Sequence, residues 1–251
     1  MKAIYSISIM VAAVAPLVLS VSVYAAQMDS RIETSARQSY VYKTYLQGDD
    51  IKIQSNNGAV TLTGVVSENF HKSLAQDTVI GLPGVKSVDN RLEVKGAPPT
   101  ANSDAWLRDK VKVTLLFHRS VSAAATEVDV KDGIVTLHGT VASQAQKELT
   151  AEYSKDVEGV KGVNNEIIVT KSSKKVRSVG EKIDDASITA QVKMTLLYHR
   201  SSSAVNTKVE TKRGVVTLYG KAKNTAELNL ATKLASDIDG VTNVKNRMAI
   251  E

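Results

Sequence analysis

Four histidines are the side chains in this sequence best suited to acid–base or metal chemistry: His71, His118, His138 and His199. None has the His-x-x-x-His or carboxylate–His spacing that is typical of a metal site. The chain has no cysteine, which excludes thiolate ligands, a cysteine nucleophile and disulfides. It also has no Gly-x-Ser-x-Gly elbow and no phosphate-binding glycine loop. We therefore expect no enzyme, no cofactor and no metal site.

The histidines lie within an internal repeat that organises the whole chain. Two signatures, Val-Thr-Leu-x-Gly and Gly-Val-x-x-Val-x-Asn, each occur three times, with constant offsets of 75 and 81 residues. They span Val60–Gly64, Val135–Gly139, Val216–Gly220, Gly84–Asn90, Gly159–Asn165 and Gly240–Asn246. The segment His118-Arg119-Ser120 recurs as His199-Arg200-Ser201, but the first copy lacks it and is about five residues shorter there. We expect these two histidines at the polar end of a helix, and His138 on an exposed strand.

Each copy has the pattern helix, strand, strand, helix, strand. The first helix has one buried stripe in the second copy and one in the third, formed by Leu107, Val111, Leu115, Ile188, Val192 and Leu196. The first two strands are joined by a tight type I′ turn at Asn57-Gly58, Asp132-Gly133 or Arg213-Gly214. Capping patterns predict second helices beginning after Ser143 and Asn224, and third strands follow at 160–169 and 241–250.

Nine glycines of the repeat are predicted to have structural roles. They lie in turns, at a strand end or where two backbone segments approach closely. They are Gly58, Gly64, Gly84, Gly133, Gly139, Gly159, Gly214, Gly220 and Gly240. The predicted fold is α+β, with three tandem αββαβ modules, each a small three-stranded mixed sheet packed against two helices. The modules span 28–96, 103–171 and 183–251, and we number them one to three.

Residues 1–25 have the features of a secretory signal peptide. Lys2 precedes an apolar run from Ile4 to Val23, and small residues lead to a cleavage site near Ala25. An uncleaved membrane anchor is the alternative, although Pro16 and the small-residue ending favour cleavage. No cysteine follows the site, so a lipid anchor of the lipoprotein kind is excluded. We expect an exported, periplasmic protein.

The net charge of +6 is unevenly distributed. Residues 28–98 and 103–171 are close to neutral, whereas 172–182 carry four basic residues and one acidic residue, and 183–251 carry ten and seven. The excess is either a solvated linker or an electrostatic contact with an anionic surface such as lipid headgroups. Nucleic acid is not expected as a partner, because the chain is predicted to leave the cytoplasm and has no basic–aromatic stacking pattern.

The repeats resemble the BON domain family, whose pattern is Asp-Gly-x-Val-Thr-Leu-x-Gly followed by Gly-Val-x-x-Val-x-Asn. Gly133 to Asn165 and Gly214 to Asn246 carry it most fully, and the first copy has Asn57 in place of the aspartate. The resemblance covers nearly the whole mature chain. A signal peptide followed by tandem BON modules is similar to the osmotically inducible periplasmic group, which has two modules rather than three. The resemblance implies a role in envelope or osmotic stress, no catalytic residues, and binding to phospholipid membranes or a chaperone-like contact with proteins.

The predicted binding site is a helix-end patch on the first helices of modules two and three. If Leu107, Val111 and Leu115 face the core, then the other apolar residues of that helix cannot all share the same face. The patch comprises Val113, Leu116, Phe117, Met194, Leu197 and Tyr198, with basic neighbours Lys112, Arg119, Lys193 and Arg200. An apolar patch with basic neighbours suits shallow docking on an anionic membrane. Burial of the patch, either against the next module or within a wider core face, is the alternative.

Two functions follow from the sequence: peripheral binding to anionic phospholipid, and a chaperone-like or protein-binding role without lipid. The helix-end patch supports both equally, and the basic C-terminal third favours the first. Because modules two and three share the helix end that module one lacks, they are predicted to be the binding modules, with module one either structural or a spacer.

Overall fold

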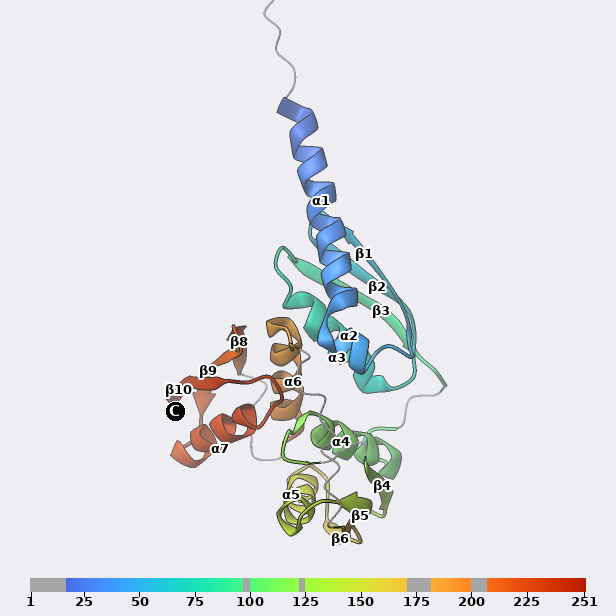
Figure 1. The fold of residues 1–251 in the computed structure, drawn as a ribbon, viewed down its shortest axis with the longest axis vertical. Coiled ribbons are helices and arrows are strands. Elements are labelled where there is room, and N and C mark those ends of the chain that lie inside the picture. The colour runs from blue at the N-terminus through green and yellow to red at the C-terminus, as the bar shows by residue number, and fades with distance from the viewer. Residues whose placement is uncertain (1–16, 97–99, 122–124, 171–181, 200–206) are drawn as a thin grey trace, which may run out of the picture.

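The computed structural model describes residues 17–96, 100–121, 125–170, 182–199 and 207–251, which fold as three α+β modules (Figure 1). Each module follows the predicted order helix, strand, strand, helix, strand. In each, the second strand is the central strand of a mixed sheet. The predicted fold class, three tandem αββαβ modules, is therefore confirmed.

Module one begins with two helices, α1 (Leu17–Gln38) and α2 (Tyr40–Thr44), because Ser39 interrupts the helix and caps α2. The strands β1 (Asp50–Asn56) and β2 (Ala59–Val66), the helix α3 (Asn69–Ile80) and the strand β3 (Ser87–Val94) follow. Helix α1 runs without a break through Ala25, and residues 1–16 lie outside the described residues. Removal of the signal peptide therefore stays a prediction. Among the described helices, none is both long and apolar enough to cross a membrane.

Modules two and three repeat this arrangement with one long first helix each. Module two contains α4 (Asp104–Phe117), β4 (Thr126–Lys131), β5 (Ile134–Val141), α5 (Gln144–Lys155), β6 (Gly162–Asn165) and β7 (Ile168–Val169). Module three contains α6 (Asp185–Tyr198), β8 (Lys208–Lys212), β9 (Val215–Ala222), α7 (Thr225–Ser236) and β10 (Asn243–Ile250). The third strand of module two, predicted as one strand over 160–169, is thus divided into β6 and β7 around Glu166 and the buried Ile167.

Buried and more exposed residues alternate along the strands, so one side of each sheet faces the core. Strand β2 pairs antiparallel with β1 and parallel with β3, and Val60 and Leu62 are buried under the helices. The equivalent Val and Leu of the other two Val-Thr-Leu signatures are buried as well. The predicted stripes on the first helices are also buried, and Ser143 and Asn224 cap α5 and α7 as the capping patterns predict.

The hairpin turns have the backbone that their sequences predict. Asn57, Asp132 and Arg213 have φ values of 52°, 54° and 54°, and each precedes a glycine with positive φ. A carboxylate of the first helix accepts both turn N–H groups in each module; it begins the helix in modules two and three and lies within α1 in module one. In module two, Asp104 Oδ2 accepts from Asp132 N at 2.7 Å and Oδ1 from Gly133 N at 2.9 Å. Asp29 and Asp185 make the same two bonds in modules one and three.

The glycine of Val-Thr-Leu-x-Gly does not end the strand. It allows the backbones of the first two strands to approach closely. Strand β2 continues past Gly64 to Val66, and Gly64 has a φ of 121°. A Cβ at this position would lie 1.9 Å from the carbonyl oxygen of Asp50 on β1. Gly139 meets the Ala125 carbonyl oxygen in the same way, so any side chain here would force the first two strands apart.

The asparagine that ends the second signature ties the third strand to the second helix. The Asn165 amide donates to the Lys147 carbonyl oxygen at 2.8 Å, and its Oδ1 accepts the Ile167 N–H at 3.3 Å. Asn90 and Asn246 make the corresponding pairs of bonds in the other modules. The turn pair, the buried Val and Leu, the glycine of Val-Thr-Leu-x-Gly and the final asparagine thus each have a structural role within their own module.

Replacing the turn-binding carboxylate should destabilise the module that contains it. Asp104→Ala removes two charge-assisted hydrogen bonds to turn N–H groups, and we expect the free energy of unfolding to fall by about 1.5–3 kcal/mol. Urea unfolding followed by circular dichroism measures this loss. Glu127→Ala, an exposed carboxylate of the same module, is the matched control and should change little. Equal midpoints for both variants would contradict the role of Asp104.

Candidate functional site

Helix α6 is the structural centre of the chain. Ten of its 14 residues are buried, whereas a helix that packs only on its own sheet buries one face. In Figure 1, α6 lies between α3 of module one, α4 of module two and α7 of its own module. The surfaces available to a partner are therefore those that remain after the three modules have packed around α6.

Module one contacts α6 through backbone hydrogen bonds at a helix start. The Tyr40 N–H donates to Asp184 Oδ2 at 2.8 Å, and the Val41 N–H donates to Ser187 Oγ at 3.1 Å. These N–H groups begin α2 and have no partner within that helix. Asp184 also caps α6 by accepting from the Ser187 N–H, so one carboxylate joins the starts of two helices from different modules.

The predicted helix-end patch is largely buried, which corrects the expectation that it is exposed. Val113, Phe117 and Met194 are 1%, 0% and 1% exposed. The cause is packing between modules: α4 lies against α6, and the Phe117 ring packs edge-on against Tyr45 of module one at 5.3 Å between centroids. The alternative interpretation of the patch, burial against another module, is the one that the structure shows.

The remaining apolar members of the patch are accessible to different degrees. Leu197 is 49% exposed, whereas Leu116 and Tyr198 are partly buried. Burial, together with the nearby carboxylates Asp109 and Asp77, raises the pKa of Tyr198 to about 12. Leu197 alone is too small an area to form the docking patch that the sequence predicts.

The basic neighbours of the patch are mostly engaged within the chain. Lys193 pairs with Asp77 of α3 at 3.2 Å. The Arg119 guanidinium donates to carbonyl oxygens of module three, including those of Ile238 at 3.0 Å and Val241 at 3.1 Å. Lys112 is exposed, and Arg200 lies outside the described residues.

Modules two and three contact each other reciprocally: the end of the first helix of each module meets the end of the second helix of the other. The end of α4 meets the end of α7 at the bridge between His118 and Ile238, and the end of α6 meets the end of α5 at the bridge between Val157 and His199. Both pairs are related by the repeat offset of 81 residues. The hydrogen bonds follow the same relation, since Asp239 N donates to Phe117 O and Glu158 N donates to Tyr198 O, each at 3.4 Å. The contact therefore resembles a two-fold interface between identical subunits.

Asp237 is the polar centre of this reciprocal contact. Its carboxylate accepts from Tyr153 Oη at 2.7 Å and from Ser120 Oγ, and lies 3.1 Å from His118 Nδ1. Burial alone would raise the pKa of Asp237, but these hydrogen bonds outweigh burial and hold it below its ordinary value. The equivalent pair, Asp156 and His199, is separated by 3.5 Å. Both histidines are buried, and His118 stacks on Tyr153 at 3.9 Å.

The sequence contained a signal for this contact that our reading of the motifs missed. Asp156 and Asp237 recur at the offset of 81, just as the His-Arg-Ser segments do, and module one has Gly81 at that position. Gly81 instead lets the end of α3 approach α6, where an added Cβ would lie 3.3 Å from the Ala186 side chain. Module one thus packs on α6 by a different surface because it lacks both halves of the reciprocal contact.

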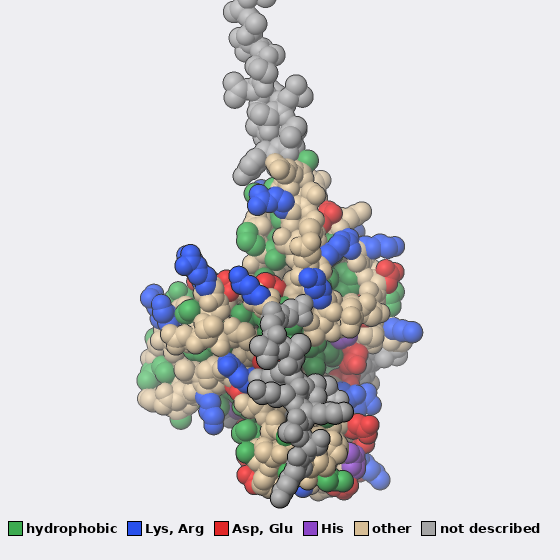
Figure 2. All heavy atoms as spheres, in the orientation of Figure 1, with side chains coloured by type: hydrophobic (Ala, Val, Ile, Leu, Met, Phe, Trp, Pro, Cys, Tyr) green, Lys and Arg blue, Asp and Glu red, His purple; other side chains and the backbone are tan. Residues whose placement is uncertain are grey.

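A second surface lies on the open side of the module-three sheet. Strand alternation and register bring five basic side chains to this side, which we call the basic sheet face: Lys208, Lys212, Lys221, Lys245 and Arg247. All five residues are exposed, and Tyr219 lies between Lys208 and Arg247 in the register. The acidic residues there are Glu210, paired with Lys208 at 2.7 Å, and Glu251, 3.7 Å from Lys221. Figure 2 shows basic side chains over this part of the molecule, at the left of the view.

The same side of the other two sheets has a different charge. In module two the equivalent positions carry one basic residue, Lys131, and three acidic ones, Glu127, Asp129 and Glu166. In module one they carry three basic residues, Lys52, Arg91 and Lys95, and two acidic ones, Asp89 and Glu93. His138 lies on this side in module two and is partly exposed, 3.3 Å from Glu166. A strongly basic sheet is thus a property of module three.

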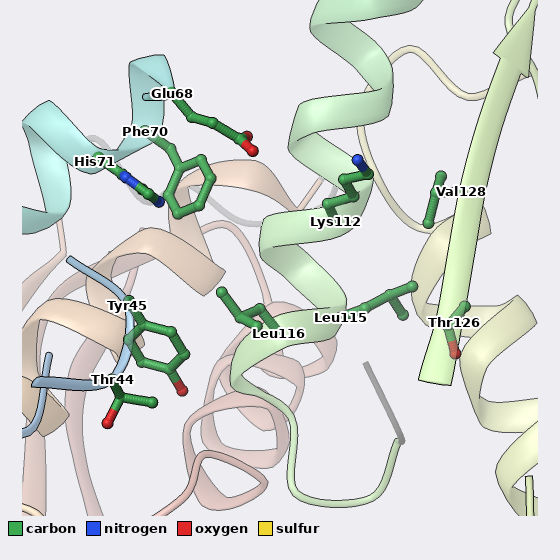
Figure 3. A pocket seen from close by; sticks show the side chains of 10 residues that line it. All are labelled: Thr44, Tyr45, Glu68, Phe70, His71, Lys112, Leu115, Leu116, Thr126 and Val128. Atoms are coloured by element: carbon green, nitrogen blue, oxygen red, sulfur yellow. The ribbon is translucent and has the colours of Figure 1, made fainter. Parts of the chain in front are cut away.

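A cavity of about 350 Å³ lies between modules one and two (Figure 3). Lys112 and Leu116 of the predicted patch line it from α4, opposite Tyr45, Glu68 and Phe70 of module one. His71 belongs to the same wall, with Nδ1 2.6 Å from Asp49 Oδ2. Among the described residues, no three His, Asp or Glu side chains come together as a metal site would require.

Comparison with known proteins finds the same domain family three times along the chain. The profile of the BON domain family matches residues 28–96, 103–171 and 184–251. The chain is 32% identical to osmotically-inducible protein Y of Escherichia coli K12 over 198 residues, covering 78% of this chain and 95% of that protein. It is 34% identical to outer membrane lipoprotein DolP of Haemophilus influenzae over 111 residues, covering 43% of this chain and 57% of that protein. Among solved structures, the C-terminal domain of CdsD from Chlamydia trachomatis has 18% identity, covering 84% of this chain and 95% of that one, with a TM-score of 0.24.

The contact between modules two and three should weaken in acid. Because the folded-state pKa of Asp237 is lowered, its ionised form stabilises the fold above the ordinary carboxylate pKa of about 3.9, and this contribution is lost as the pH falls through the lower folded value. At pH 7, Asp237→Asn should lower the free energy of unfolding by about 2 kcal/mol. The gap between the variant and the wild type should close below about pH 4.

Urea midpoints between pH 7 and pH 3 measure this dependence. Glu127→Gln removes an exposed carboxylate of module two and is the control, with a midpoint expected to track the wild type at every pH. A gap between Asp237→Asn and the wild type that stays constant down to pH 3 would contradict the assignment.

Proposed function

Because this chain belongs to the BON domain family, we propose that it is a periplasmic protein of osmotic or envelope stress that binds anionic phospholipid surfaces peripherally. The names of its relatives, an osmotically-inducible protein and an outer membrane lipoprotein, support the compartment and the stress. The predicted signal peptide agrees with export. No catalytic step is part of this proposal.

The basic sheet face carries the lipid part of the proposal. Five exposed basic residues with two acidic neighbours give the open side of the module-three sheet a net positive charge. Each Lys or Arg near an anionic membrane contributes about 1 kcal/mol, and contributions from one flat face act together. Lys208 lies over the Tyr219 ring at 5.9 Å, and tyrosine is favoured at the headgroup level of membranes.

This site differs from the helix-end patch that the sequence predicts. Docking through the patch would require α4 to leave α6, because Val113, Phe117 and Met194 are buried between them. Docking through the basic sheet face requires no separation of modules, since α6 and α7 cover the opposite side of that sheet. The second surface therefore offers the lower-energy route to a membrane.

A second candidate function is binding to an extended protein segment. The edge strand β7 exposes Ile168 and Val169, at 63% and 37%, beside the central strand β5. An unpaired apolar edge can take an added strand from a partner. Ile168→Lys should then abolish any ability of the protein to slow aggregation of an unfolded client, measured by light scattering, and an undiminished effect would remove this candidate.

Cosedimentation with vesicles tests the lipid proposal. The mature protein should bind vesicles that contain phosphatidylglycerol, should not bind vesicles of phosphatidylcholine alone, and should be released by salt. Lys212→Gln, Lys245→Gln and Arg247→Gln together should lower the partition coefficient about 100-fold, at about 1 kcal/mol each. None of the three has an ion pair among the described residues, so folding should be unaffected.

The matched control carries Lys52→Gln, Arg91→Gln and Lys95→Gln, three basic residues on the same side of the module-one sheet. It loses the same total charge and should keep most of the binding. If both triple variants lose binding equally, net charge rather than the basic sheet face is responsible. If the wild type binds neither vesicle, the lipid proposal is wrong.

A further inference from the structure

The cavity between modules one and two has the size and lining of a small-molecule site. Its volume of about 350 Å³ falls within the range of about 300–1,000 Å³ that is usual for such sites. Aromatic and aliphatic side chains form much of its wall: Tyr45, Phe70, Leu115 and Leu116. A few polar groups converge on this apolar surface, as they do in binding pockets.

Glu68 supplies a carboxylate without a partner. It precedes α3 at the N-cap position but makes no side-chain capping bond. Its Oε2 is buried and has no hydrogen-bond partner among the described residues. Figure 3 shows the carboxylate directed into the space between the Phe70 ring and α4. A buried, unpaired carboxylate oxygen costs free energy that a bound cation would recover.

The aromatic wall of the cavity also favours a cation. The Phe70 ring lies next to Glu68 in the cavity wall, and Tyr45 is held in place by edge-on contacts with Phe117 and Tyr40 at 5.3 and 5.8 Å. Burial raises the pKa of the Tyr45 phenol above its ordinary value. A carboxylate next to an aromatic ring suits an organic ammonium group, because the ring face also attracts a cation.

Lys112 supplies the opposite charge from the other wall. It rises from α4 and is exposed, without an ion pair among the described residues. His71 is already bonded to Asp49, which leaves Lys112 as the accessible cation of the cavity. The two walls thus present one free negative and one free positive group, separated by apolar side chains.

We propose that this cavity binds a free amino acid with an apolar side chain. The ammonium group binds Glu68 and the aromatic rings, the carboxylate binds Lys112, and the side chain lies on Leu116 and Phe70. Because the ligand contacts both α3 and α4, it links module one to module two. This site is separate from the basic sheet face and does not depend on lipid binding.

Titration of the full mature chain with L-leucine, followed by calorimetry and by saturation-transfer NMR, tests the proposal. We expect saturable binding, weakened at least tenfold for leucinamide, which lacks the carboxylate, and for N-acetyl-leucine, which lacks the ammonium group. Glu68→Gln and Lys112→Gln should each weaken L-leucine binding at least tenfold. Glu93→Gln and Lys52→Gln, exposed residues of module one, should leave it unchanged.

Circular dichroism of each variant shows whether it is folded, so loss of binding by a folded Glu68→Gln supports the site. The proposal is overturned if L-leucine does not bind, if the two blocked analogues bind as tightly as L-leucine, or if folded Glu68→Gln binds as the wild type does. Each of these results leaves the membrane proposal unaffected, because vesicle binding is measured separately.

Discussion

The burial of ten of the 14 residues of α6 is the constraint that determines how the three modules are arranged. A module of about 70 residues is near the lower limit for an independent core, and the first helix of module three carries apolar side chains all round. Alone, module three would expose Ala186, Ala190 and Met194 to water. Packing of α3 and α4 against α6 removes that exposure, so the linkers join modules that stabilise one another.

The reciprocal contact explains why modules two and three are so similar at their helix ends. Each supplies a histidine that follows its first helix and an aspartate that follows its second, and the two sets interlock. Such an arrangement is typical of a symmetric dimer whose two copies are now on one chain. Module one lacks both elements and meets α6 through the start of α2 and the end of α3, which makes it a structural partner of module three rather than a detached spacer.

Sequence patterns predicted the features that depend on nearby residues, such as turns and helix caps. They missed the features that depend on packing between modules. The turn at Asp132-Gly133, the close approach at Gly139 and the caps at Ser143 and Asn224 follow from residue types at short range, and all were predictable. The burial of Phe117 was not, because a single helix pattern cannot tell a surface that meets solvent from one that meets another module. The basic sheet face could have been found by aligning the strands of the three copies, since Lys245 and Arg247 stand where module two has Asn164 and Glu166.

The three modules form one body around α6, and a distance measurement between modules tests this arrangement most directly. The chain has no cysteine, so Lys52→Cys and Lys233→Cys place two spin labels specifically, on exposed sites of modules one and three. Double electron–electron resonance on the full mature chain should give a single narrow distance population. A broad distribution, as expected for modules that move independently on flexible linkers, would contradict the account.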